Sequence, residues 1–308
     1  MKLMNRREIV RLLTLASGTA LCGCSSAPFR LFGQLVKHQD EHDAQDIAET
    51  KAQESTFVKQ APPPQESMQD LKTKSDYFEQ NFPDDVFFTG RKLELVKSLV
   101  VKFRAVQNYV GYGHFNVMGM DEFFRCAAAA RGAGEITAEE RLFLEEMFYF
   151  DAKKYGFQGD KVVLGFTDTL DKSSVVKVPG SGHFLLKGIA LDTYEKIRKD
   201  VGESLILTSG VRALAKQYHL FFEKGLEAGG NMSKASRSLA PPGYSFHGQG
   251  DFDVGRKGYG LRNFTDQFAA TEEYKKLLDL GYVQIRYTAS NELGVRFEPW
   301  HIKVHSHG

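Results

Sequence analysis

The sequence predicts an α+β fold, with an antiparallel central sheet flanked by helices and preceded by a mainly helical region. Two observations support this expectation. Between residues 82 and 157, apolar residues recur at three- and four-residue spacings, the period of helices that pack on a core. After residue 159, short β-like runs broken by glycine mix with helical stretches, without the regular strand–helix–strand order of a parallel sheet.

The helical region is predicted to pack at least two helices onto a core. RKLELVKSLVVKFRAVQNYV, residues 91–110, carries the helical spacing throughout. The segment ITAEERLF places Thr137 as an N-cap and Glu140 three residues later, which predicts a capping box. Cys126, within FFRCAAAAR, is expected to be a small core residue.

The part after residue 159 is expected to contain short strands and three helices. The expected strands are KVVLGF (161–166), HFLLKGIAL (183–191), SLILTSG (204–210), GYVQIRYT (281–288) and GVRFEPWHIKV (294–304). The expected helices span residues 191–201, 214–228 and 270–280.

The first residues have the pattern of an export signal. A basic start and a weakly apolar stretch lead to LCGC, which is typical of a bacterial lipoprotein signal with Cys24 as the lipidated residue. We therefore expect residues 1–23 to be a signal peptide, and the protein to be exported to the periplasm. Because Ser25 follows Cys24, anchoring to the outer membrane is expected. Arg6 and Arg7 also fit twin-arginine export, with a plain secretory signal as the alternative.

Residues 24–80 are predicted to form a disordered tether. They are poor in aromatic residues and rich in Gln, Glu, Asp and Lys, so they cannot bury enough apolar surface to order themselves. A flexible coil of this length spans about 40 Å, enough for an anchored domain to search a nearby cell-wall layer. The expected organisation continues with a mainly helical region over residues 81–180 and a catalytic domain over residues 181–308.

Composition excludes some functions. The chain of 308 residues has a net charge of +1, with 42% hydrophobic and 26% charged residues, so it lacks the basic surface that nucleic-acid binding requires. Cleavage before Cys24 leaves Cys126 as the single free thiol, so no internal disulfide is expected.

Two histidines have carboxylates close by in the sequence. Glu298 lies three residues before His301 in EPWH, where it can take the proton of a metal-bound water. Pro299 interrupts the expected strand or places it at an edge. These residues alone also allow a simpler interpretation, an edge-strand acid beside a hydrogen-bonded core histidine.

The glycine-rich stretch PPGYSFHGQGDFDVG, residues 241–255, supplies the second half of a candidate site. Asp251 and Asp253 alternate with apolar residues, so both lie on one face of a strand. The glycines after His247 permit a tight turn back toward that strand. An aspartate and His247, joined by His301 from a later strand, then form a set of three ligands suited to zinc.

These segments together resemble the zinc D-alanyl-D-alanine carboxypeptidases of the VanY and VanX type. The signature of that family, SxHxxGxAxD followed by ExxH, is similar to SFHGQGDFDVG and EPWH here. LTSGVRALAKQ is similar to the family's SGYRS segment with its later glutamine, and GYVQIRY to the strand before EPWH. The resemblance covers residues 205–304. It implies a VanY/hedgehog-like fold, a bound Zn²⁺ and peptidoglycan stem peptides as substrate.

The resemblance also implies roles for the matched residues. His247 and His301 match zinc ligands and Glu298 matches the general base. Arg212 matches an arginine that stabilises the charged transition state, as a fixed guanidinium can. Ser245 matches a serine for which the resemblance implies substrate contact. Gln217 matches a glutamine that either contacts substrate or supports a residue of the site.

One spacing departs from the family pattern. The family places its aspartate seven residues after the histidine, where this chain has Val254. Asp253, at six residues, is the expected ligand because DVG mirrors the family's DIG. Asp251, at four, is expected to be a partner of a ligand or a substitute for one.

The leading hypothesis is hydrolysis of the terminal D-Ala-D-Ala bond of stem peptides, with Glu298 as the general base. An L,D-carboxypeptidase or a cross-link endopeptidase could use the same site. The shortened spacing also allows a non-catalytic peptidoglycan-binding lipoprotein. A serine hydrolase built on Ser245, His247 and Asp253 is disfavoured, because no GxSxG elbow surrounds the serine. The terminal His305 and His307 are expected to belong to a flexible tail.

Overall fold

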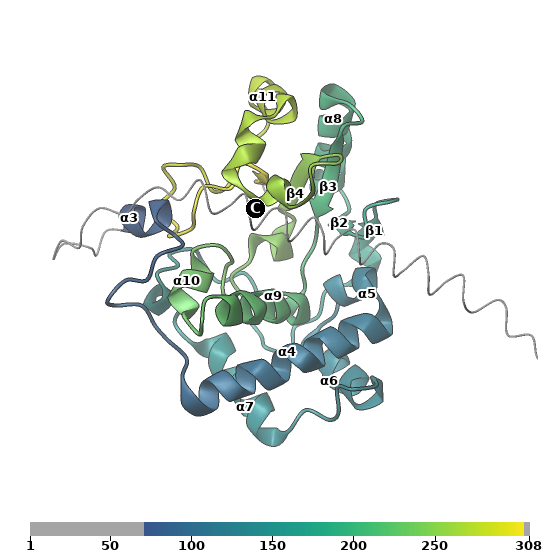
Figure 1. The fold of residues 1–308 in the computed structure, drawn as a ribbon. Coiled ribbons are helices and arrows are strands. Elements are labelled where there is room, and N and C mark those ends of the chain that lie inside the picture. Colours follow the sequence, from purple (N-terminus) through teal and green to yellow (C-terminus); the bar gives the residue numbers. More distant parts are fainter. Residues whose placement is uncertain (1–70, 305–308) are drawn as a thin grey trace, which may run out of the picture. The chain divides into compact units, whose positions relative to one another are not determined.

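A computed structural model of the chain describes residues 71–304 (Figure 1). These residues lie within one compact unit, Glu54–Gly308. The expected signal peptide, most of the tether, His305 and His307 lie outside the described residues. The end of the expected tether differs from a coil, because Leu71–Asp76 form helix α3. Within residues 71–304, no helix is long and apolar enough to cross a membrane.

The helical part is built on one long helix. The helices are α4 (Gly90–Val110), α5 (Tyr112–Asn116), α6 (Met120–Ala129) and α7 (Ala138–Tyr149). The predicted capping box is confirmed at the start of α7, where Glu140 N donates to Thr137 Oγ1 over 3.1 Å and Thr137 N donates to Glu140 Oε2 over 2.8 Å. Cys126 is half-buried and packs at the edge of the core rather than inside it.

Helix α9 (Leu214–Glu227) belongs to the same core as α4, although it follows the boundary expected near residue 181. Phe103 of α4 stacks on Tyr218 of α9, with 6.2 Å between ring centroids and 9° between ring planes. Figure 1 shows α9 between α4 and the strands, and its buried side chains belong to the helical core. The short helix α10 (Met232–Ser236) packs beside it.

The sheet beside the site has three antiparallel strands in the order β3 (Leu205–Ser209), β4 (Phe252–Arg256) and β5 (His301–Ile302). Phe252 and Val254 are fully buried in a core with α8 (Ile189–Val201) and α11 (Glu272–Asp279), so β4 buries its apolar face as its alternation predicts. A register shift between Leu207 and Ser209 sets Asp253 opposite Ser209. The α+β fold class is confirmed.

Short elements connect these layers. A hairpin of β1 (Val175–Lys177) and β2 (Phe184–Leu186) crosses the expected boundary at residue 181. The 3₁₀ helices are η1 (Ala152–Tyr155), η2 (Lys172–Ser174), η3 (Phe246–Gln249), η4 (Gly260–Phe264) and η5 (Asp266–Ala270).

The three predicted helices are confirmed, but several predicted strands are shorter or absent. Residues 161–166 form no strand, because the amides of Val162 and Val163 both donate to the carbonyl of Gly243 instead of a ladder. Residues 281–288 form no strand but lie beside β5, with the isolated bridge of Ile285 with Ile302 and backbone hydrogen bonds from Arg286 N to His301 O and from Lys303 N to Gln284 O. Apolar composition favours such segments as strands, whereas strand formation also requires a continuous partner backbone.

Candidate metal centre

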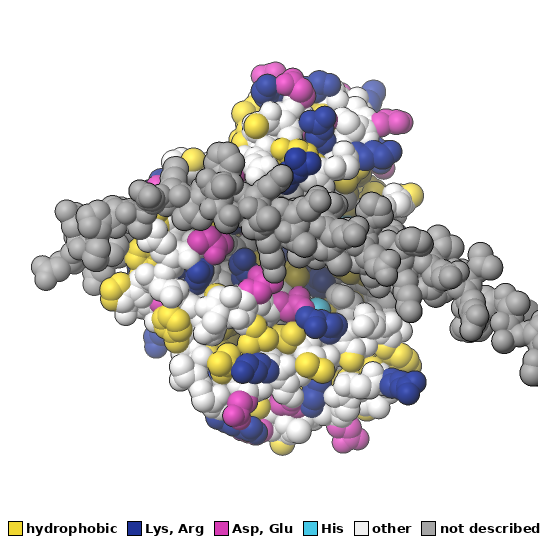
Figure 2. Space-filling view, viewed as in Figure 1, with side chains coloured by type: hydrophobic (Ala, Val, Ile, Leu, Met, Phe, Trp, Pro, Cys, Tyr) yellow, Lys and Arg dark blue, Asp and Glu magenta, His cyan; other side chains and the backbone are white. Residues whose placement is uncertain are grey.

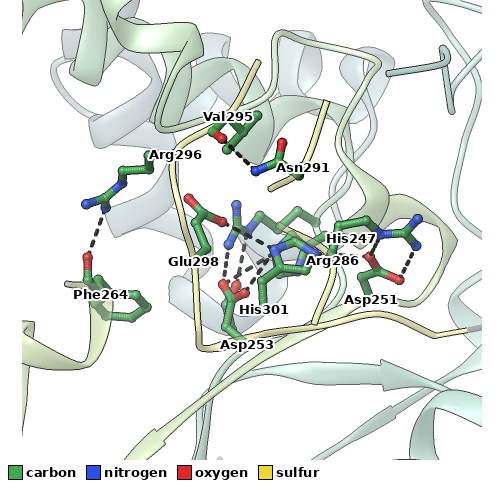
Figure 3. Close-up of polar contacts among 12 residues, drawn as sticks. His247, Asp251, Asp253, Phe264, Arg286, Asn291, Val295, Arg296, Glu298 and His301 are labelled. Carbon is green, nitrogen blue, oxygen red and sulfur yellow. Dashed lines mark hydrogen bonds and ion pairs between the residues drawn. The ribbon is translucent and has the colours of Figure 1, made fainter. Parts of the chain in front are cut away.

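Three buried side chains from different elements converge at the end of the central sheet. His247 comes from η3, Asp253 from β4 and His301 from β5. Their candidate ligand atoms lie within 4.8 Å of one another, and each residue is 1–3% exposed. Figure 3 shows His247, Asp253, His301 and Glu298 pointing toward one another.

The ring of His247 is held so that one nitrogen faces the site. Its Nδ1 donates to the carbonyl of Gly210 over 2.8 Å, and its Nε2 lies 3.3 Å from Asp253 Oδ2. Burial, reinforced by the charge of Arg212, lowers the pKa of His247 to about 4. The imidazole is therefore neutral at physiological pH, the form that binds a metal.

The ring of His301 lies between two aspartates. Its Nε2 is 3.0 Å from Asp251 Oδ2, whereas its Nδ1 is 3.3 Å from Asp253 Oδ1 and 3.5 Å from Glu298 Oε2. Burial disfavours the imidazolium, but the hydrogen bonds to Asp251 and Glu298 and the charge of Asp253 outweigh it. Together they raise the pKa of His301 to about 9.

Asp251 is already fully engaged. Arg286 donates to both of its carboxylate oxygens, over 2.6 and 2.9 Å, and the amide of Val304 donates to Oδ1 over 2.8 Å. The carboxylate therefore orients His301, the usual task of a carboxylate behind a ligand histidine. The sequence did not lead us to predict a role for Arg286. The one indication was its position in GYVQIRY, the segment that is similar to the family's strand before EPWH.

Asp253 is the aspartate that faces both histidines. Its Oδ2 accepts a hydrogen bond from Arg212 Nη2 over 2.7 Å, while its Oδ1 has no hydrogen-bond partner. Burial raises the pKa of this carboxyl, but its interaction with His247 and the charge of Arg212 prevail and hold the pKa well below its usual range. Asp253 is therefore ionised and available as a ligand.

The donor set fits a zinc ion. His247 Nε2 and Asp253 Oδ1 are buried without a hydrogen-bond partner, a costly arrangement that a bound cation would relieve. The opposite ring nitrogens of His247 and His301 are bonded to Gly210 and Asp251, so the other nitrogen of each ring faces the site; His301 would release a proton on binding a metal there. Two imidazoles and one carboxylate also make up a usual ligand set of catalytic zinc.

A cavity of about 270 Å³ opens beside these residues. Glu298, 6% exposed, lines it together with Arg212, whose Nε donates to Ser209 Oγ over 2.9 Å. Tyr287 also lines it, with its ring centroid 4.8 Å from that of His301. Figure 2 shows acidic, basic and histidine side chains gathered in the middle of the face that it presents.

The two residues expected to contact substrate are placed differently. Ser245 lines the cavity, and its backbone carbonyl accepts the amide of Gly248 over 3.0 Å to close the turn of His247. Gln217 is buried and does not line the cavity, and its Nε2 donates to the carbonyl of Ala240. Ala240 lines the cavity, so Gln217 supports its wall from behind.

Three ligand-type side chains with a carboxylate beside them on an open cavity form the arrangement of a metal-dependent hydrolase. Residues 187–307 match the family model described as VanY, D-alanyl-D-alanine carboxypeptidase. The predicted resemblance is confirmed over this part of the chain, which includes His247, Asp253, Glu298 and His301. The C-terminal part of the chain is thus similar to this peptidase family.

Several solved structures are similar to part of the chain. The LdcB LD-carboxypeptidase is 24% identical, with a TM-score of 0.37, over 44% of this chain and 69% of that one. A mutant of the vancomycin resistance D,D-pentapeptidase VanY, in complex with Zn(II), is 22% identical, with a TM-score of 0.33, over 42% and 77%. The D,D-dipeptidase VanXYg, in complex with a D-Ala-D-Ala phosphinate analog, is 21% identical, with a TM-score of 0.35, over 43% and 54%. No curated protein matches the chain.

Proposed function

We propose that the protein is a zinc-dependent peptidoglycan carboxypeptidase that hydrolyses the terminal D-Ala-D-Ala bond of cell-wall stem peptides. The observation that carries this proposal is the convergence of His247, Asp253 and His301 beside Glu298 on one cavity. The family match over residues 187–307 supports the substrate class.

The zinc ion would be held by His247 Nε2, a carboxylate oxygen of Asp253 and His301 Nδ1. When bound there, zinc polarises a carbonyl and lowers the pKa of a water molecule toward neutrality. Asp251 and the carbonyl of Gly210 keep the two rings oriented, because each bonds the nitrogen that faces away from the site.

The remaining chemistry belongs to side chains of this chain. Glu298 accepts the proton of the attacking water and passes it to the leaving amine nitrogen. A C–O bond forms, the peptide C–N bond breaks, and the products are the shortened peptide and D-alanine. The guanidinium of Arg212 donates to the oxygen on which negative charge develops. Ser245, on the cavity wall, contacts the substrate.

The test is to incubate the purified protein with defined muropeptides and to weigh the products. Loss of one alanine from a pentapeptide stem supports the proposal. Cleavage of tetrapeptide stems alone would instead assign an L,D-carboxypeptidase, and cleavage of cross-linked dimers alone an endopeptidase. Glu298→Gln is the matched variant, since it keeps the ligands and should lower turnover about 10²–10⁴-fold.

Metal analysis separates an enzyme from a non-catalytic peptidoglycan-binding lipoprotein. One zinc per chain in the wild type, lost in His247→Ala, supports the enzyme. A wild-type protein that contains no zinc and gains none on incubation with it supports the binding protein. Retention of zinc in Glu298→Gln, together with lost turnover, supports Glu298 as the base rather than as a ligand.

For localisation, we propose export to the periplasm, anchoring to the outer membrane by a lipid on Cys24, and a tether over residues 24–80. This proposal rests on the sequence of the signal and its cysteine. Labelling with a radioactive fatty acid should mark the wild-type protein. It should not mark Cys24→Ser, and a label retained in that variant would contradict lipidation at Cys24.

A further inference from the structure

The wall of the cavity is completed by residues that precede the family match. Tyr112 and Asn116, from α5, line the cavity together with residues of α9. Three lining residues of α9 form a row, because they recur every four positions on one face of the helix: Lys216, Leu220 and Lys224. Arg212, which contacts Asp253, lines the same cavity just before α9 begins, so the cavity leads from the metal centre along α9 to the helical region.

The helical region is tied directly to the beginning of α9. The backbone amide of Ala213 donates to the carbonyl of Asn116 over 2.7 Å, and the amide of Ala215 donates to the carbonyl of Met118 over 3.3 Å. These bonds fix the backbone on both sides of Leu214, immediately after Arg212. The position of Tyr112 and Asn116 relative to the metal centre is therefore set by backbone contacts.

Lys216 is a buried cation in this wall. It is 5% exposed, its Nζ donates to Gln107 Oε1 over 2.8 Å, and it lies 4.7 Å from the centroid of the Tyr112 ring. No carboxylate among residues 71–304 lies within ion-pair distance of it. Burial, followed by the like charge of Arg212, lowers the pKa of Lys216 to about 8, so most of it remains charged at neutral pH.

A buried ammonium without an anion is costly, and an amide oxygen with an aromatic face compensates for only part of that cost. An anion that enters the cavity would supply the missing partner. Lys216 and Arg212 line the same cavity, and the two cations are close enough for the charge of Arg212 to act on Lys216. An anion bound at Lys216 would therefore lie next to the reacting centre.

We propose that Lys216, together with Tyr112 and Asn116 of the helical region, forms a carboxylate-binding subsite that selects peptides with a free carboxylate near the scissile bond. The inference rests on the proposed function for its substrate class. The carboxylate is either the C-terminal carboxylate of the peptide or that of an acidic side chain. The helical region thereby takes part in specificity.

The test compares four forms of one stem peptide, in which the C-terminal carboxylate and the acidic side chain are each free or amidated. In the wild type, amidation of the recognised carboxylate should raise KM about tenfold to hundredfold, with little change in kcat. In Lys216→Met, which removes the charge but keeps an unbranched side chain of similar size, KM should be equally high for the free and the amidated form. The carboxylate whose amidation raises KM in the wild type but not in Lys216→Met is the one that the subsite binds.

A matched control and a binding readout complete the test. Lys102→Met removes a half-buried lysine of the helical region that pairs with Glu140 away from the cavity, and it should leave the preference for the carboxylate intact. Trp300, the single tryptophan, lines the cavity, so its fluorescence reports peptide binding without turnover in Glu298→Gln. Adding Lys216→Met to that variant should weaken binding of the carboxylate form alone.

The outcomes separate the two proposals. If the wild type cleaves the peptides but Lys216→Met keeps the full preference for the carboxylate, the subsite is wrong and the proposed function stands. If no peptide is cleaved but Trp300 still reports carboxylate binding that depends on Lys216, the subsite stands and the proposed function is wrong. Equal binding of all four forms by the wild type overturns the subsite.

Discussion

His301 Nε2 lies 3.0 Å from Asp251 Oδ2, and this contact assigns different tasks to two aspartates that are two residues apart. Because Arg286 and His301 engage Asp251, its carboxylate cannot turn toward His247. Asp253→Asn should therefore abolish zinc binding, whereas Asp251→Asn should weaken it about 10–100-fold. Competition with a chromophoric chelator measures both affinities.

Asp279→Asn, an exposed change on α11, serves as the control for this comparison and should bind zinc like the wild type. If Asp251→Asn lost zinc completely while Asp253→Asn retained it, the ligand would be Asp251 and the family register would have to be shifted by two residues.

Gly210 is predicted to tolerate no side chain. A Cβ at this position would lie 2.0 Å from the carbonyl oxygen of Phe184, a backbone atom that cannot move without shifting β2. Gly210→Ala should therefore lower the free energy of unfolding by about 1–3 kcal/mol. It should also weaken zinc binding, because the Gly210 carbonyl orients His247. Urea denaturation with and without zinc measures both effects.

The control for this change is Gly119→Ala. Its added methyl group would lie 3.3 Å from Thr169 Cγ2, a side-chain atom that can adjust by a few tenths of an ångström. We expect a smaller loss of stability and unchanged zinc affinity. Equal losses in the two variants would contradict a special role for Gly210.

Lys216 is predicted to destabilise the folded protein when no ligand is bound. Its pKa falls from an ordinary 10.5 to about 8 on folding, so the unfolded chain binds more protons between these values and stability rises with pH in that window. Lys216→Met should therefore raise the free energy of unfolding at pH 7, by about 1–3 kcal/mol. It should also remove this part of the pH dependence.

Urea denaturation of the metal-free protein at pH 7 and pH 10 tests the prediction, because the gain from Lys216→Met should shrink at the higher pH. A variant less stable than the wild type at pH 7 would show that the bond to Gln107 stabilises the fold more than the buried charge destabilises it.

Arg212 is predicted to act through its planar guanidinium group, which donates hydrogen bonds in more than one direction. Its Nε donates to Ser209 and its Nη2 to Asp253, a geometry that a single ammonium group cannot reproduce. Arg212→Lys should lower kcat about 10²–10³-fold while zinc content remains unchanged. Peptide turnover and metal analysis on the same sample test this, with the exposed Arg198→Lys as the control. Loss of zinc in Arg212→Lys would instead mean that Arg212 holds Asp253 in place for the metal.

Local features of the fold were predictable from sequence because they depend on near neighbours in the chain. The capping box of Thr137 and Glu140 and the buried face of β4 at Phe252 and Val254 are such cases. The missing strand at residues 161–166 is not, because its amides are taken by Gly243, some eighty residues away. No local pattern reveals that competition for hydrogen bonds.

For the site, the sequence by itself determined the residue types and their order, with His247, two candidate aspartates, Glu298 and His301 in motifs typical of a zinc peptidase. Only the tertiary structure decided which aspartate faces both histidines, because Arg286 and the amide of Val304 engage Asp251 from distant parts of the chain. It likewise decided that α5 lines the cavity beside Lys216. Such contacts depend on how separate elements pack, which residue spacing along the chain does not encode.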